Sequence, residues 1–225
     1  MKLLFNRSLS VITFSFAFLF ANPIFSAPPN LTLIKNELKN YHDSGLYQKE
    51  LAQIITKAQK YIDQQAELNK KEKTHKKLAV VLDIDETSLS NYKYMIARDF
   101  GGNHKQFHKD IMAADAPPIK PMLNLYRDAR QHGVKVFFVT GRNESERKAT
   151  EKNLHQAGYS GWSGLYLRPI NYSSKSIIPF KSNTRKAITE KGYTIVASIG
   201  DQYSDLKGGY AQKVFKLPNP FYYLP

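Results

Sequence analysis

Acidic side chains follow two apolar runs in this sequence, at positions where they could share one cation. Asp83 and Asp85 come directly after the run 78–82, and Asp201 comes after the run 194–199. Two residues apart in an extended chain, Asp83 and Asp85 project to the same side. Three carboxylates at one point repel each other unless a cation lies between them, and hard oxygen ligands select magnesium. The spacing therefore predicts a Mg²⁺ site.

Such a site suits the hydrolysis of phosphate monoesters. The cation offsets the negative charge of an incoming phosphate, so an anionic nucleophile can approach it. In this interpretation the Asp83 carboxylate attacks phosphorus and forms an aspartyl-phosphate, which water then hydrolyses. Asp85 protonates the leaving oxygen and later takes a proton from the water. Thr140, at the end of another apolar run, offers a hydroxyl to a phosphoryl oxygen. A lysine is also needed to offset the charge of the acids.

Each of these motifs taken singly is more often structural than catalytic. Acids at a strand end often cap the next helix, Thr140-Gly141 alone is an ordinary turn, and Asp201-x-x-x-Asp205 also fits a solvated loop. The three motifs occur together and in order, each at the end of an expected buried strand. That combination favours the catalytic interpretation.

The elements that would position these residues form an alternating pattern. Short continuous apolar runs, typical of buried parallel strands, occupy 78–82, 134–139, 165–167, 194–199 and 213–217. Helical patterns that end at glycine occupy 122–131, 144–156 and 182–190, and residues 31–68 look helical with a break near Ser44-Gly45. The carboxyl ends of strands in such a sheet line the ligand crevice. We therefore expect an α/β fold with a Rossmann-like parallel sheet, N-terminal helices and an insertion over about 88–120.

With these motifs in this order, residues 78–217 resemble the haloacid dehalogenase-like (HAD) hydrolase superfamily. The segment 83–87, Asp-Ile-Asp-Glu-Thr, is similar to its first motif, which holds the nucleophile and then the acid/base. Thr140 is similar to the second motif, and Asp201-x-x-x-Asp205 to the fourth. The resemblance implies a HAD-like fold in which the insertion 88–120 forms a small cap.

The third motif of the superfamily is a single basic residue. Lys181, in Phe-Lys-Ser before a predicted helix, is our choice, with Lys175 as the competitor and Arg185 as a remoter one.

Within the superfamily, the first motif and the stretch 140–159 resemble the branch of secreted acid phosphatases, subfamily IIIB, which includes bacterial exported enzymes and plant vegetative storage proteins. This resemblance implies an acid phosphatase that acts on small-molecule phosphate monoesters, with nucleotides among the candidates, and that requires Mg²⁺. It implies metal ligation by the Asp83 carboxylate, the Asp85 backbone carbonyl and Asp201, with Asp205 close behind. The phosphate would be bound by Thr140, Gly141 and Lys181.

The insertion is rich in aromatic residues. Tyr92, Tyr94, Phe100 and Phe107 could stack on an aromatic or nucleoside leaving group, or could form a small core of the insertion itself. His104 and His108 lie four apart and could face one side of a helix, as a second metal site or as exposed side chains. We expect Trp162 and the terminal segment 221–223 to pack on the sheet.

The first 26 residues have the pattern of a signal peptide. Lys2 and Arg7 precede an apolar run over 9–20, which is too short to span a bilayer comfortably. Cleavage after Ser26 and cleavage after Ala21 both fit the small residues that follow. The sequence has no cysteine, so it excludes disulfides and a lipid-modified cysteine. The chain is therefore predicted to consist of a signal peptide, 1–26, and one domain, 27–225, exported to the periplasm or secreted without a stable membrane anchor.

The formal net charge is +14, and a surface this basic attracts phosphorylated small molecules, nucleic acids and anionic membranes. No recognised nucleic-acid motif is present, so no specific nucleic acid is expected as a partner. Two alternatives to a phosphatase stay open: a non-catalytic storage or binding protein on the same fold, and a phosphotransferase that uses alcohol acceptors. The intact Asp83 argues against the first. The sequence leaves the oligomeric state and the natural substrate open.

Overall fold

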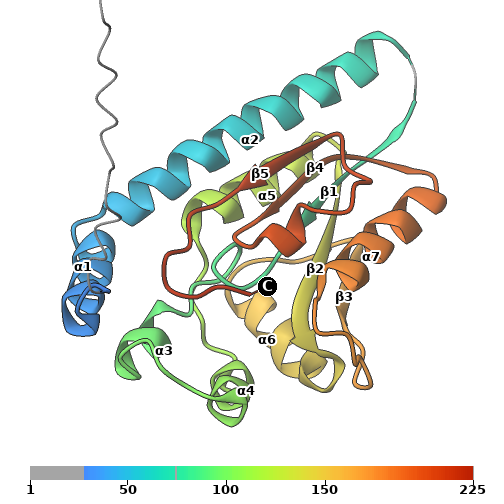
Figure 1. The fold of residues 1–225 in the computed structure, drawn as a ribbon. Helices are drawn as coiled ribbons and strands as arrows, with labels where there is room; N and C mark the ends of the chain where they lie inside the picture. Colours follow the sequence, from blue (N-terminus) through green and yellow to red (C-terminus); the bar gives the residue numbers. More distant parts are fainter. Residues whose placement is uncertain (1–27, 74, 225) are drawn as a thin grey trace, which may run out of the picture.

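A five-stranded, all-parallel sheet forms the centre of the computed structural model, which describes residues 28–73 and 75–224 (Figure 1). The strand order is β3-β2-β1-β4-β5. The strands are β1 (Lys77–Leu82), β2 (Lys135–Asn143), β3 (Gly164–Arg168), β4 (Tyr193–Gly200) and β5 (Lys213–Lys216). From β1 the chain first adds β2 and β3 on one side and then β4 and β5 on the other. A doubly wound sheet forms its ligand crevice at this switch point.

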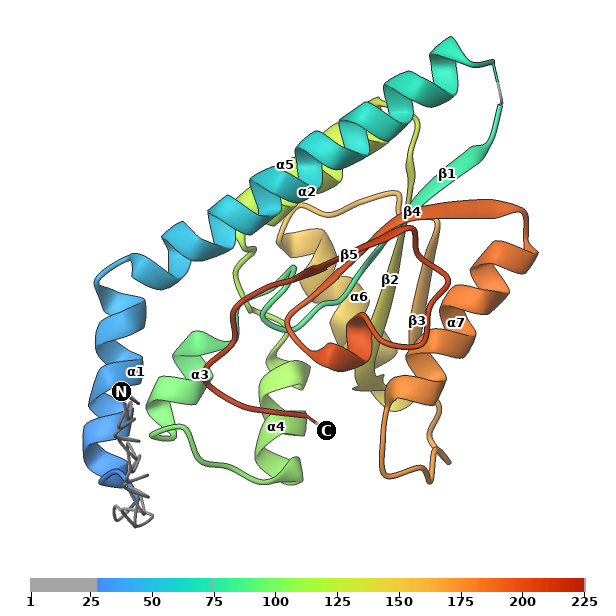
Figure 2. The ribbon, with the colours of Figure 1, turned by 45° about the horizontal axis from the view of Figure 1, so that its top comes forward.

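Helices cover both faces of the sheet. The long helix α2 (Leu46–Lys71) lies beside α5 (Lys120–Gln131) on one face, together with α6 (Arg147–Gln156) (Figure 2). The apolar residues of β1 point alternately to the two faces. Val80 and Leu82 pack into the larger core, which lies on the face covered by α2, α5 and α6. Ala79 and Val81 face the opposite side, where Ile188 of α7 (Ile178–Glu190) completes a smaller core. The continuous apolar run of β1 thus serves two layers, as expected of a central parallel strand.

The segments outside this three-layer core gather beyond the carboxyl ends of the strands. They are α1 (Leu31–Asp43), the insertion helices α3 (Tyr92–Ala97) and α4 (His104–Ala113), and the C-terminal tail (Figures 1 and 2). The ring of Tyr92 stacks on His42 of α1 and packs against Phe221 of the tail. Aromatic contacts therefore join three segments that are far apart in sequence.

The predicted α/β fold is confirmed, with differences at the ends of elements. The break near Ser44-Gly45 separates α1 from α2, and Gly45 adopts a φ of 82°, which favours glycine. Helix α7 begins at Ile178, four residues before the expected start, because Pro179 occupies the first turn, where no backbone N–H is needed. A 3₁₀ turn, η1 (Glu144–Glu146), precedes α6.

The predicted signal peptide, 1–26, lies outside the described residues. None of the helices over 28–73 and 75–224 combines the length and the apolar composition that crossing a membrane requires.

Candidate active site

Strands β1 and β4 bring Asp83 and Asp201 together. Leu82 pairs with Ile199 across the two strands, and the backbone N–H of Asp83 donates to the carbonyl of Ile199 at 3.0 Å. Each strand therefore ends at the same level, and the next carboxylates emerge side by side. Carboxylate oxygens of Asp83, Asp201 and Asp205 all lie within 4.8 Å of one another, and all three residues are buried. We call these three residues the acidic cluster.

Lys181 of α7 supplies the positive charge in this cluster. Its Nζ donates to Oδ1 of Asp83 at 2.9 Å and also to Oδ1 of Asp205, and only 4 % of the residue is exposed. Lys175, the competitor for the third motif, is exposed in the loop before α7. Arg185, the remoter alternative, has another task. Its guanidinium donates to the backbone carbonyls of Asp205 and Gly209 at 2.9 Å each and holds the loop that carries the cluster.

Close packing at the end of β4 orients Asp205. A Cβ atom added to Gly200 would lie 2.2 Å from Oδ2 of Asp205, so only glycine fits at this position. The same Oδ2 accepts from the backbone N–H of Gln202 at 2.9 Å, in the 3₁₀ turn η2 (Tyr203–Asp205) and its cap. Ser198 Oγ donates to the backbone carbonyl of Asp205 at 2.8 Å. Hydrogen bonds therefore hold both the backbone and the carboxylate of Asp205 at the end of β4.

Three neutral donors surround Asp201. Thr87 Oγ1 donates to Oδ1 at 3.2 Å, while Gln202 Nε2 and Asn219 Nδ2 each donate to Oδ2 at 2.7 Å. Thr87 belongs to the first motif, but sequence reasoning missed Gln202 and Asn219. Asn219 lies in the C-terminal tail, and no local pattern ties it to residues near the end of β4.

Asp85 departs from the expectation drawn from its spacing. The carboxylates that gather are those of Asp83, Asp201 and Asp205, whereas the Asp85 carboxylate faces Arg142. The physical reason is a turn, since the backbone N–H groups of Ser88 and Leu89 both donate to the carbonyl of Ile84 at 2.8 Å. The chain is therefore no longer extended after Asp83, and residues two apart do not project to one side.

Arg142 is a site residue to which the sequence analysis assigned no task. Its Nη2 and Nε approach Oδ1 and Oδ2 of Asp85 at 2.7 and 3.1 Å, and Asn91 Nδ2 adds a donor at 2.8 Å. Burial opposes ionisation of Asp85, but the Arg142 charge and these hydrogen bonds hold the pKa of Asp85 below its usual value.

The acidic cluster carries more negative charge than Lys181 neutralises. Burial raises the pKa of Asp83 well above its usual value, and the Asp205 carboxylate adds to the rise. Burial also raises the pKa of Asp201 to about 6. For Lys181, burial disfavours the ammonium, yet Asp205 and Asp83 more than offset this and raise its pKa. Three carboxylates facing one ammonium leave room for a divalent cation.

Comparison with known proteins now identifies the family. Residues 25–225 match the family model described as HAD superfamily, subfamily IIIB (Acid phosphatase). The chain belongs to HAD subfamily IIIB.

Plant proteins are similar to this member of subfamily IIIB. It is 39 % identical to "Acid phosphatase 1" of Solanum lycopersicum over 148 residues, which are 64 % of this chain and 58 % of the tomato protein. It is 35 % identical to "Stem 28 kDa glycoprotein" of Glycine max over 73 % of this chain and 68 % of that protein. It is 34 % identical to "Vegetative storage protein 2" of Arabidopsis thaliana over 64 % and 56 %.

A solved structure shares the fold. The Class C acid phosphatase from Bacillus anthracis superposes with a TM-score of 0.68 at 22 % identity, covering 85 % of this chain and 86 % of that one. This likeness supports the HAD-like architecture.

Thr140 and Gly141, the predicted second motif, lie within the last part of β2, which continues to Asn143. Thr140 is buried there and its Oγ1 accepts from the backbone N–H of Arg142 at 3.1 Å, while the Gly141 carbonyl accepts from Arg168 Nε at 3.1 Å. The neighbouring strand pairs through Leu82 and Phe138, so β2 ends beside β1. Thr140 and Gly141 are therefore strand residues, near the same edge of the sheet as Asp83.

Most of the aromatic residues in the insertion of this IIIB protein contact the C-terminal tail or other residues of the insertion. Tyr92 and Phe100 contact Phe221 of the tail, and Tyr94 Oη donates to Asp115 at 2.5 Å, whereas Phe107 is exposed. The second metal site suggested by the histidine spacing does not assemble among residues 28–73 and 75–224. His104 is exposed there, and His108 Nδ1 contacts Oε1 of Glu146 at 2.8 Å.

The tail of this IIIB protein reaches the same edge of the sheet. Tyr222 Oη donates to Oε2 of Glu86 at 3.0 Å, which places the tail against the first motif. Burial, followed by the Asp85 charge, raises the pKa of Glu86 to about 8. Trp162 instead packs at the edge of the larger core, against Phe138 and His155, as predicted.

Proposed function

We propose that this protein is a magnesium-dependent acid phosphatase that hydrolyses phosphate monoesters through an aspartyl-phosphate on Asp83. The observation that carries the proposal is the acidic cluster with the Lys181 ammonium between Asp83 and Asp205, at the carboxyl edge of a parallel sheet. Membership of the acid phosphatase subfamily and the similarity to the tomato acid phosphatase support the same activity.

The residues present fit a magnesium ion. The donor set consists of carboxylate oxygens only, which a hard divalent cation prefers. The carboxylates are buried and outnumber Lys181, so a cation relieves a real repulsion. Asp83 and Asp201 would hold the ion, together with the backbone carbonyl of Asp85. Asp205 pairs with Lys181 and would lie next to these ligands without binding the ion directly. When bound, the ion supplies positive charge that offsets the phosphate and the developing charge of the transition state.

The nucleophile in this proposal is the second oxygen of Asp83. Lys181 donates to Oδ1, and none of the described residues donates a hydrogen bond to Oδ2. A bond forms between this oxygen and phosphorus while the bond to the leaving oxygen breaks. Lys181 and the Thr140 hydroxyl bind phosphoryl oxygens and orient them for attack, with Gly141 leaving space beside them.

Asp85 is the proton carrier. It gives a proton to the leaving oxygen and then takes one from the water that hydrolyses the aspartyl-phosphate. Arg142 holds Asp85 ionised, which suits the second step. The first step needs the protonated carboxyl, whose population grows at acid pH, so an acidic optimum follows from the Arg142–Asp85 pair.

The substrates proposed are small-molecule phosphate monoesters, nucleotides among them, met outside the cytoplasm after export. A panel of nucleoside, sugar and aryl phosphates, each with and without a chelator, ranks these classes. The exposed Phe107 is the insertion aromatic that can contact a leaving group, since Tyr92 and Phe100 already pack on Phe221.

Asp83→Asn tests the proposal most directly. The near-isosteric amide keeps the shape of the site but cannot attack phosphorus, so we expect release of phosphate from an aryl phosphate to fall at least about 10³-fold. Circular dichroism should show an unchanged fold.

Asp99→Asn is the matched control, because Asp99 is an exposed carboxylate that pairs with Lys35 in α1, and its activity should stay at the wild-type level. Wild-type activity should disappear with a chelator and return with Mg²⁺. Full turnover by Asp83→Asn would contradict the mechanism, and full turnover in the chelator would contradict the metal requirement.

A further inference from the structure

A second group of potential metal ligands lies between the helices α2 and α5, away from the acidic cluster. It consists of Asp63 on α2 with Asp128 and His132 on α5 and at its end. Asp128 and His132 are four apart, so one helical turn places both side chains on the same side of α5. Helices α2 and α5 run side by side in both views (Figures 1 and 2). The group has ligand atoms from both of these segments.

The three ligand atoms lie close together, in side chains that are 28 to 36 % exposed. His132 Nδ1 lies 3.6 Å from Asp63 Oδ1 and 3.4 Å from Asp128 Oδ2. Each of these atoms is shielded from solvent, and within the described residues none of the three has a hydrogen-bond partner. Buried polar atoms are nearly always paired, so three unpaired atoms at one point indicate a missing partner.

The separations match the coordination shell of a small ion. Zinc bonds of about 2.0–2.2 Å to nitrogen and carboxylate oxygen place tetrahedral ligands about 3.3–3.6 Å from one another. The observed separations of 3.4 and 3.6 Å fall in this range. Imidazole and carboxylate together suit zinc and its neighbours in the transition series better than they suit magnesium.

The charges also favour a cation. Burial and the adjacent Asp128 carboxylate raise the pKa of Asp63 to about 6, although His132 opposes the rise. Two carboxylates beside one imidazole therefore repel each other at neutral pH. The nearby Lys70 pairs with Glu67 at 3.2 Å on the surface of α2.

We propose that Asp63, Asp128 and His132 form a binding site for Zn²⁺ or a similar transition-metal ion that ties α2 to α5. The three side chains supply one ligand atom each, and water takes the fourth position. The two helices come from separate parts of the chain, so only the folded protein brings the three ligands together. An ion that binds the folded state alone stabilises it by mass action. The site is independent of the phosphatase proposal.

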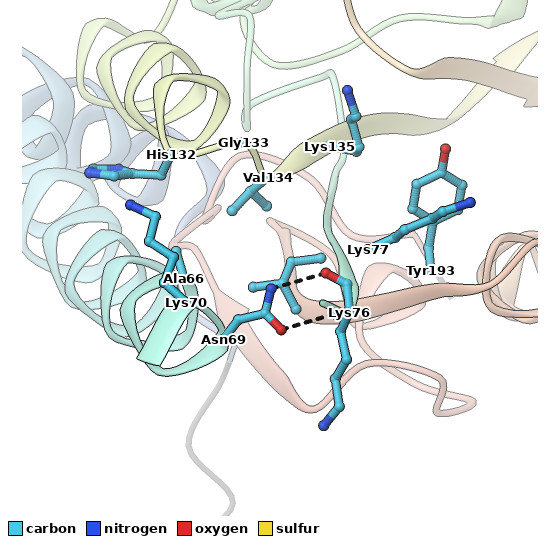
Figure 3. Close-up of a pocket in the computed structure, with 11 residues that line it drawn as sticks. Ala66, Asn69, Lys70, Lys76, Lys77, His132, Gly133, Val134, Lys135 and Tyr193 are labelled. Atoms are coloured by element: carbon cyan, nitrogen blue, oxygen red, sulfur yellow. Dashed lines mark hydrogen bonds between the residues drawn. The ribbon is translucent and has the colours of Figure 1, made fainter. Parts of the chain in front are cut away.

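The proposed metal site lies far from the acidic cluster in the sheet. His132 lines a pocket of about 340 Å³, which is also lined by Val134, Lys135, Lys77 and Tyr193 (Figure 3). Lys77, Lys135 and Tyr193 are the first residues of β1, β2 and β4. This pocket therefore lies at the amino edge of the sheet, whereas the acidic cluster lies at the carboxyl edge.

The test uses the protein carrying Asp83→Asn and Asp201→Asn, which removes two of the three carboxylates of the acidic cluster. Calorimetric titration with Zn²⁺ alone should show one bound ion per chain, and Zn²⁺ should raise Tm. Co²⁺ bound there should give the intense visible absorption of a tetrahedral site. Adding His132→Gln, or separately Asp63→Asn, should weaken Zn²⁺ binding at least tenfold and abolish the Co²⁺ signal.

His104→Gln in the same background is the matched control, because His104 is an exposed histidine, and this variant should bind Zn²⁺ unchanged. Asp63→Asn in the wild-type chain should keep its magnesium-dependent activity. The proposal is overturned if the double variant binds no Zn²⁺ at micromolar concentration, or if His132→Gln and Asp63→Asn both leave binding and the Co²⁺ spectrum intact.

Discussion

Lys181 connects two of the three carboxylates of the acidic cluster. It is almost fully buried and lies in direct contact with Asp83 and Asp205, so its ammonium limits their repulsion. In the proposed mechanism it also binds the phosphate. A buried charge of this kind is expensive to leave unpaired, and its removal leaves the carboxylates without protein compensation. In the proposed mechanism the residue therefore serves both phosphate binding and catalysis.

Replacing Lys181 with glutamine should lower the phosphatase rate about 10²-fold, because one charge that stabilises the transition state is lost. Steady-state kinetics with an aryl phosphate measure this effect. Lys175→Gln serves as the control, since Lys175 is an exposed lysine just before the same helix. Equal rates for the two variants would show that Lys181 is not the third-motif residue.

Arg142 sets the protonation of the proposed proton carrier. Its guanidinium contacts both oxygens of Asp85 and lowers the pKa of that carboxyl. Arg142→Gln should let this pKa rise by roughly 1–3 units. The limb of the pH–rate profile that reports Asp85 should then move to higher pH by the same amount. An Asp85→Asn variant cannot titrate at this position, so the limb of the pH–rate profile that it lacks is the limb that reports Asp85. If that limb does not move in Arg142→Gln, Arg142 does not control the pKa of Asp85.

At the scale of elements, the end of β4 positions two members of the acidic cluster. Asp201 follows the strand directly, and the turn η2 returns Asp205 against Gly200. Asp205 can take this position only because residue 200 has no side chain. This dependence gives a test that removes no charged group.

Gly200→Ala should displace the Asp205 carboxylate and lower activity strongly, with a loss of stability of about 1–3 kcal/mol from overpacking. Urea unfolding and an aryl phosphate assay measure the two effects. Gly133→Ala is a useful comparison, because Gly133 has a φ of 79° but open space around it. It should lose about 1 kcal/mol of stability through backbone strain alone and keep its activity. Unchanged activity in Gly200→Ala would mean that the position of Asp205 is unimportant.

At the scale of the whole molecule, we expect the buried acids to make stability depend on pH and, through the proposed site, on magnesium. The folded-state pKa values of Asp201, about 6, and Glu86, about 8, lie above their values in the unfolded chain, near 3.8 and 4.5. The folded state therefore holds protons that the unfolded state releases. This contribution is complete below about pH 4 and is lost as pH rises through 6 to 8. The lowered pKa of Asp85 acts below pH 4, outside this window.

Without metal, Tm should therefore fall by roughly 5–10 °C between pH 5.5 and 7.5, and Mg²⁺ should recover most of the loss at pH 7.5. Thermal unfolding followed by circular dichroism, with a chelator or with Mg²⁺, measures both. In Asp201→Asn the pH dependence should flatten and the magnesium effect should shrink. A Tm that rises with pH in the chelator would show that these buried carboxyls do not control stability.

Much of this protein could be predicted from local patterns. Apolar runs that end in acids, alternating with helices that end at glycine, indicated the parallel sheet and placed Asp83, Asp201 and Thr140 at one edge. These features are short-range, because strand burial and helix capping depend on neighbours in the chain. The choice of Lys181 over Lys175 as the third-motif residue stays a prediction, favoured by the contacts of Lys181 with Asp83 and Asp205.

Other features exist only in the folded chain. The turn after Asp83 sends Asp85 to Arg142, the tail brings Asn219 to Asp201, and two helices bring Asp63 to His132. In each case the partners are separated by many residues, so no spacing rule relates them, and packing of the helices and tail on the sheet decides the contact. The sequence by itself determined which residues could do chemistry, and the tertiary structure decided their partners.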